Sequence, residues 1–113
     1  MKNSQPKKTT MYAIVFDLDQ AKLKEAHPDT WHTDAYRKVA KVLKSHGFTS
    51  VQGSVYFGDM DKVDAVSCMI AVMDVVEANP WFAEAVTDIR MLRIEDNNDL
   101  MPLVQRVSKK TSA

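Results

Sequence analysis

The sequence predicts an α+β fold in which helices cover one face of an antiparallel sheet. Three patterns support it: an apolar, β-branched run over residues 11–17, three- and four-residue apolar spacing over 33–46 and 61–78, and alternation over 87–94. Two short strands within residues 48–57 complete the order β-α-β-β-α-β, which is the split βαβ, ferredoxin-like arrangement. The other sheet face would be bare and apolar, so we expect a homodimer that buries it.

The length and composition indicate a single domain. The chain has 113 residues, of which 45% are hydrophobic and 27% charged, as in ordinary globular proteins. We expect this domain to span residues 11–107, between disordered tails over 1–10 and 108–113 that are polar and lack periodicity. The apolar run Met11–Phe16 is too short for a signal peptide or a membrane span, so we expect no membrane association.

The charge balance restricts how the chain can bind nucleic acid. Fifteen basic and fifteen acidic side chains cancel, so any such binding needs a local basic patch. The helix over residues 33–46 offers one, because Lys41 and Lys44 lie opposite its apolar face. The one cysteine, Cys68, excludes an intrachain disulfide, is expected in the core and suggests a reducing cytoplasm.

The remaining elements follow from local signals at their ends. Proline and glycine mark the breaks, because proline disfavours helical geometry in the residue before it and glycine permits tight turns. Met69 and Met73, at helical spacing, are expected to fill the core. The signals predict a helix over 20–26 with a break at 27–29, a hairpin turn at Gln52-Gly53, a helix end at Asn79-Pro80, a short helix over 81–85 and a last amphipathic helix over 99–107.

Two carboxylates, Asp17 and Asp19, follow the first strand directly. Burying an ionised carboxylate is costly unless a cation or donor compensates, so acids at this position either cap the next helix or carry chemistry. Paired carboxylates can share a Mg²⁺ ion, or one of them can be held protonated and act as a general acid. If two copies pack sheet to sheet, Asp17 of each copy could face its twin.

Two other polar groups are candidates for binding or catalysis. Gln52, Ser54 and Tyr56 alternate around a glycine and can hold a phosphate or a base, although a hairpin turn explains the same pattern. Arg90 and Arg93 are expected on the face of the last strand that carries Asp88. Arginine forks suit phosphate, but a solvated ion-paired face accounts for them equally well.

Several classes of site are absent from the sequence. The three histidines are too irregularly spaced for a metal motif and have no cysteine partners. No glycine-rich phosphate loop and no Ser-His-Asp pattern occurs, so we expect no organic cofactor.

The ordered set of motifs resembles the bacterial virulence-associated protein D (VapD) family. The matching residues cover about 11–105, and the chain departs from the family in its lysine-bearing N-terminal extension and in the insert-like segment 27–32. The segments that carry the resemblance are Met11 to Leu18, Gly47-Phe48, Gln52 to Tyr56, Trp81-Phe82, Asp88 to Arg90 and Glu95-Asp96.

The resemblance implies a ferredoxin-like homodimer, related in fold to the small CRISPR-associated adaptation nuclease, with endoribonuclease activity. In some members it also implies a toxin role opposed by an antitoxin protein. On this basis Asp17 matches the strand-end aspartate of the family and is the best catalytic candidate. The segment Gln52 to Tyr56 and Arg90 match the other shared polar positions, and Asp19 is left as a cap.

We therefore expect an enzyme that cleaves single-stranded RNA, with Asp17, Ser54 and Arg90 as catalytic candidates. Gln52, Tyr56, Lys41 and Lys44 would bind the substrate. Asp17 would either bind Mg²⁺ or Mn²⁺, or act directly on the ribose 2′-hydroxyl. The rival hypotheses are a non-catalytic dimeric module that binds a partner protein, and a metal-dependent DNA nuclease.

Overall fold

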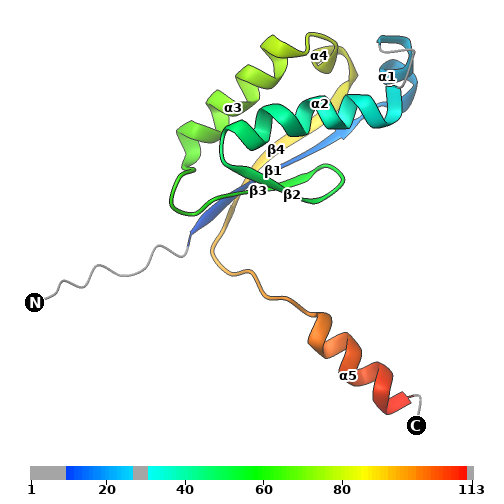
Figure 1. Ribbon diagram of the computed structural model, residues 1–113, viewed down its shortest axis with the longest axis vertical. Coiled ribbons are helices and arrows are strands. Elements are labelled where there is room, and N and C mark those ends of the chain that lie inside the picture. Colours follow the sequence, from blue (N-terminus) through cyan, green and yellow to red (C-terminus); the bar gives the residue numbers. More distant parts are fainter. Residues whose placement is uncertain (1–9, 27–30, 112–113) are drawn as a thin grey trace, which may run out of the picture.

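The computed structural model describes residues 10–26 and 31–111 of the chain, and the predicted break at 27–29 and the tail 1–9 lie outside them. Within the described part, no helix combines the length and apolar character needed to cross a membrane. Figure 1 shows the elements, which are β1 (Met11–Leu18), α1 (Gln20–Ala26), α2 (Trp31–Ser45), β2 (Phe48–Gln52), β3 (Val55–Gly58), α3 (Ala65–Ala78), α4 (Trp81–Ala85), β4 (Val86–Ile94) and α5 (Met101–Thr111).

The four strands form one antiparallel sheet in the order β2-β3-β1-β4. This order confirms the predicted ferredoxin-like topology, in which the first strand is central and the last is at an edge. β1 therefore exchanges hydrogen bonds with β3 on one side and β4 on the other, and its position is fixed by both. A residue at the end of β1 lies between two other strand ends.

The helices cover the sheet face that carries alternate residues of β1. Ile14, Phe16 and Leu18 are buried together with residues of α1, α2, α3 and α4, which places all four helices on this face. Phe16 lies at the centre of an aromatic cluster. Its ring stacks on those of Tyr36 and Tyr56 at centroid distances of 6.3 and 6.1 Å and meets Phe82 edge-on at 5.6 Å.

The opposite face of the sheet, here called the open face, is apolar along much of its length. Residues directly opposite each other in neighbouring strands share a face. The register pairs Ala13 with Phe57 and Leu92, and Val15 with Val55, so these five side chains lie on the open face. Because α1 to α4 all lie on the other side, none of these four helices covers it, as the sequence predicted.

Two predicted helices begin at different residues from those expected. α2 begins at Trp31, where the sequence predicted residue 33. α3 begins at Ala65, four residues after the predicted start, because Asp64 is its N-cap and accepts a hydrogen bond from the Ser67 amide at 2.8 Å. Residues 59–62 form a turn in which the Asp59 carboxylate accepts from the Asp61 amide.

The C-terminal helix differs most from its prediction. α5 begins at Met101, where the Asp99 carboxylate accepts the Met101 amide at 2.9 Å, and it continues to Thr111. Residues 108–111 are therefore helical, and the predicted disordered tail over 108–113 is wrong for them. Figure 1 shows that α5 lies well away from the sheet, beyond an extended segment. The predicted domain bounds of 11–107 stay a prediction.

We expect Phe16→Ala to lower the free energy of unfolding by about 3–5 kcal/mol, because it removes the central ring of the aromatic cluster. Urea unfolding followed by circular dichroism measures the change. Val51→Ala is the control, because Val51 lies in β2 with 47% of its surface exposed. Equal losses for the two variants would contradict the central role of Phe16.

Candidate active site

Asp17 lies on the open face at the end of the central strand. Its neighbours along β1, Phe16 and Leu18, are buried on the helix side, so alternation directs Asp17 to the opposite face. In the β1–β4 register Asp17 lies directly opposite Asp88. The register then shifts, and the Thr87 hydroxyl donates to the Asp17 carbonyl oxygen at 3.2 Å. Two carboxylates thus face each other across the strand pair, beside an irregularity that ends the regular ladder.

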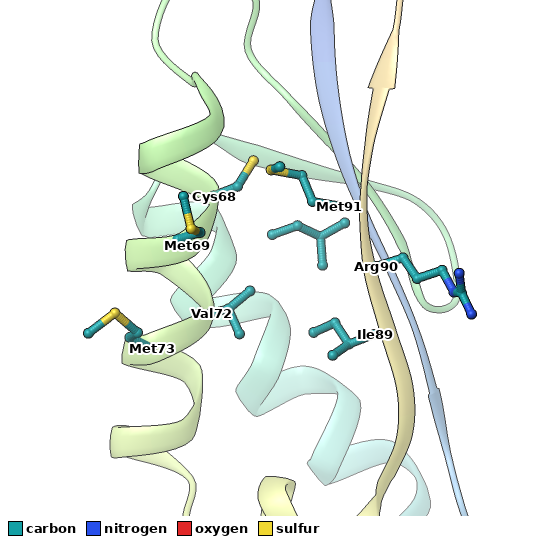
Figure 2. Close-up of a pocket in the computed structure, with 8 residues that line it drawn as sticks. Cys68, Met69, Val72, Met73, Ile89, Arg90 and Met91 are labelled. Atoms are coloured by element: carbon teal, nitrogen blue, oxygen red, sulfur yellow. The ribbon is translucent and has the colours of Figure 1, made fainter.

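Arg90 lies on the same face, two residues after Asp88. Its Nε donates to both Asp88 carboxylate oxygens, at 3.0 and 3.3 Å. The hydrogen bond and charge of Asp88 raise the pKa of the guanidinium, which is charged at any physiological pH. Figure 2 shows this side chain extending away from α3. Because both partners are exposed, the pair is weak and the guanidinium is accessible to another anion.

The β2–β3 hairpin turn flanks the other side of the β1 end. The Phe16 amide donates to the Ser54 carbonyl at 3.2 Å, which brings the turn beside Asp17 in the sheet. Gly53 has a φ of 35°, in the region that favours glycine, and a side chain there would meet open space. Gln52 is exposed and Ser54 half-buried. The structure therefore brings Gln52 and Ser54 to the same end of the sheet as Asp17.

Asp19 is the cap of α1. Its carboxylate accepts the Lys22 amide at 2.9 Å, and its carbonyl accepts the Leu23 amide at 2.9 Å. The Asp19 amide in turn donates to the Ala85 carbonyl at 2.8 Å, which ties the start of α1 to the end of α4. This confirms the capping role left to Asp19 and separates it from Asp17, whose side chain lies on the open face.

One prediction about the last strand needs correction. Arg93 pairs with Tyr12, and Tyr12 lies on the helix side of β1, so Arg93 does not share a face with Asp88 and Arg90. Arg90 and Arg93 are three residues apart, and residues at this spacing in a strand point to opposite faces. Asp88 does share the face of Arg90, as expected. Its spacing of two from Arg90 was visible in the sequence, but its position opposite Asp17 depends on the β1–β4 register.

Tyr56 was predicted to bind substrate, but the structure places its ring in the core. Only 2% of its surface is exposed, and the ring stacks on Phe16. Burial raises the pKa of its phenol, and a hydrogen bond with Ser50 offsets this only in part. Tyr56 thus has no free surface with which to contact a nucleotide, and its partners are structural.

Lys41 and Lys44 also lie apart from Asp17. α2 packs on the sheet through Ala35, Val39 and Leu43, and the two lysines are exposed on the helix. Since α2 covers the helix side and Asp17 lies on the open face, the sheet separates the lysines from the carboxylate. The predicted substrate patch and the predicted catalytic acid are therefore not brought together in one chain.

The cluster of Asp17, Asp88 and Arg90 has the groups needed for chemistry at a phosphate. A carboxylate can accept a proton, and a guanidinium can bind a phosphate through two parallel hydrogen bonds. Among the described residues no group of three or more histidine, cysteine or acidic side chains gathers as a metal site. Asp17 and Asp88 nevertheless supply the oxygen ligands that Mg²⁺ prefers, and one or two protein carboxylates are its usual complement.

Comparison with known proteins gives a consistent result. Residues 10–101 match the model of the family described as CRISPR associated protein Cas2. Endoribonuclease VapD 2 of Riemerella anatipestifer is 44% identical over 94 residues, which cover 83% of this chain and 99% of that protein.

Two further relatives extend the comparison to other genera. The endoribonuclease VapD homolog of Helicobacter pylori is 44% identical over 86% of this chain and 99% of its own length. Endoribonuclease VapD of Dichelobacter nodosus is 36% identical over 84% of this chain and 98% of its own length. With the matching topology, these similarities show that the chain belongs to the VapD group of the CRISPR-associated Cas2 family.

Proposed function

We propose that this chain is an endoribonuclease of single-stranded RNA and that Asp17, Asp88 and Arg90 form the centre of its active site. The names of its relatives support the reaction class. The observation that supports the site is the register of β1 and β4, which sets Asp17 opposite Asp88 with Arg90 on the same face. Ser54 and Gln52, from the adjacent hairpin, would contact the substrate at its edge.

In this proposal Asp17 acts on the ribose 2′-hydroxyl next to the scissile phosphate. Its carboxylate accepts the hydroxyl proton, the 2′-oxygen bonds to phosphorus, and the 5′-oxygen leaves and takes up a proton from water. Arg90 exchanges its contact with Asp88 for the phosphate oxygens, on which negative charge increases in the transition state. Asp88 holds the Arg90 fork in place before the RNA binds.

A second role for Asp17 is to bind Mg²⁺ or Mn²⁺ together with Asp88. A divalent ion there would neutralise phosphate charge and activate water. In that case Arg90, which already donates to both Asp88 oxygens, would orient the second carboxylate.

The proposed enzyme works as a homodimer in the cytoplasm. Two open faces packed together would remove their apolar side chains from water and bring two Asp17 side chains towards the symmetry axis. Lys41 and Lys44, which lie across the sheet from Asp17, would then guide RNA only from the outer surface of the dimer. A toxin role with an antitoxin protein is part of the same proposal and rests on the family alone.

We expect Asp17→Asn to slow RNA cleavage by about 10²–10⁴-fold, because the amide cannot accept the hydroxyl proton. The assay is the rate of cleavage of a labelled single-stranded RNA by purified chain. Asp19→Asn is the matched control, since asparagine caps a helix as well as aspartate and full activity should remain. Equal activity of parent and Asp17→Asn would refute the site, and no activity in the parent would favour a binding module.

We expect Arg90→Gln to reduce kcat by about 10²–10³-fold, the usual effect of losing one group that stabilises the transition state. Arg93→Gln is the control, because Arg93 lies on the other side of the same strand. Both variants remove one positive charge, so a general electrostatic contribution would lower their activities equally. Such equality would contradict the proposed role of Arg90.

The two roles of Asp17 predict different substrates. If Asp17 acts on the 2′-hydroxyl, an RNA with one 2′-deoxy residue at the cleavage site stays intact, and the normal RNA is cut in EDTA. The products then end in 2′,3′-cyclic phosphate, which mass spectrometry detects. We expect this result. Cleavage of the deoxy substrate or of DNA, restored by Mg²⁺ or Mn²⁺ after EDTA, would assign the metal role instead.

A further inference from the structure

The C-terminal helix α5 exposes a continuous apolar face. Its apolar residues follow the spacing of an amphipathic helix that packs on another surface. A helix of 11 residues is marginal in water, so its stability depends on such packing. Between 50 and 63% of the surface is exposed for Leu100, which directly precedes α5, and for its residues Met101, Leu103, Val104 and Val107.

A groove of matching character lies between α3 and β4. Figure 2 shows it open between the helix and the strand, and its volume is about 390 Å³. Arg90 is on its rim and extends away from it. The remaining lining is apolar or sulfur-containing and comprises Ile14, Cys68, Met69, Val72, Met73, Ile89 and Met91.

The outer surface of α3 continues the groove. Met69 and Met73 were predicted to fill the core, and that prediction is wrong, because 55 and 60% of their surfaces are exposed. Val66 and Ile70 are exposed on the same helix. Exposed apolar surface of this extent in a protein indicates an interaction site.

The charges of the two surfaces are complementary. α5 carries Arg106 and Lys109 and no acidic residue. α3 and its cap carry Asp64, Asp74 and Glu77 and no basic residue. Asp74 already pairs with His46 at 2.7 Å, and Arg90 is the charged residue on the groove rim, so the acidic contribution comes from Asp64 and Glu77. A basic amphipathic helix that lies on an acidic, apolar helix gains from both contacts.

We propose that α5 of one copy of this chain docks in the α3–β4 groove of a second copy, and that the second copy does the same in return. The position of α5 supports a second copy over the same chain, since the segment after β4 carries it away from its own groove (Figure 1). A specific interface requires roughly 1,000 Å² of buried surface, and both symmetric contacts would contribute to it.

The reciprocal docking of α5 rests on the homodimer of the proposed function, but it does not depend on RNA cleavage. Its test therefore measures association and not activity. If the chain forms dimers in which α5 does not dock on the second copy, the proposed homodimer holds and only the docking of α5 is overturned.

The experiment uses two populations of the full chain, each with one introduced cysteine beside native Cys68. One carries Met73→Cys in the groove and the other Val104→Cys in α5, and they are mixed in urea, refolded together and treated with a short bis-maleimide. Native Cys68 stays, because its burial and a pKa raised to about 11 keep its thiol slow to react. We expect a crosslinked heterodimer, identified by the mass of one chain from each population.

Val51→Cys replaces Met73→Cys in the control, because Val51 is exposed in β2, at the opposite edge of the sheet. Equal crosslinking to this control would overturn the proposal. A chain that carries both Met73→Cys and Val104→Cys tests self-docking. An internal crosslink in that chain, with no heterodimer in the mixture, would also overturn it.

A second measurement needs no crosslinker. We expect the double variant Leu103→Asp with Val104→Asp to raise the dimer dissociation constant at least about tenfold, since both side chains leave the apolar contact. Analytical ultracentrifugation measures it, and circular dichroism checks that the sheet domain is intact. Gln105→Asp, on the polar side of α5, is the matched control. An unchanged constant for the double variant would refute docking of α5.

Discussion

The packing of Phe16 is the constraint on which the rest of the structure depends. This ring contacts aromatic side chains from α2, β3 and α4, so its burial fixes which side of β1 faces the helices. Because successive side chains of a strand point to opposite faces, the Asp17 side chain lies on the other side of the sheet. A core interaction thus determines where the carboxylate is presented, and the two sides of one strand have separate functions.

Much of the fold could be predicted from local patterns, because strands and helices have different apolar periods. The short helix over 81–85 and the ferredoxin-like order were predicted and are confirmed, and the hairpin turn predicted at Gln52-Gly53 lies one residue later, at Gly53-Ser54. Local patterns could not give the position of α5. A helix with one apolar face must pack on something, but the sequence does not say whether that surface belongs to the same domain.

The site was predictable only in part, because its residues come together through register. Asp17 was identified from its place at a strand end and from a family resemblance. Asp88 joins it through the β1–β4 pairing, which includes a shift that no pattern in the sequence marks. Tyr56 and Lys44 lie away from Asp17 in the structure for a different reason: alternation and helical periodicity show which residues share a face, but not which layer of the fold that face meets.

The open apolar sheet has a consequence for how the protein tolerates sequence change. Along β1, substitutions at Ile14, Phe16 and Leu18 act on the core beneath the helices, whereas those at Val15 and Asp17 act on the open face. Core packing and the surface of the proposed site are therefore encoded on alternate residues of one strand. A substitution on the open face therefore leaves the aromatic cluster intact, whereas loss of the Phe16 ring affects both faces, because the same packing orients Asp17.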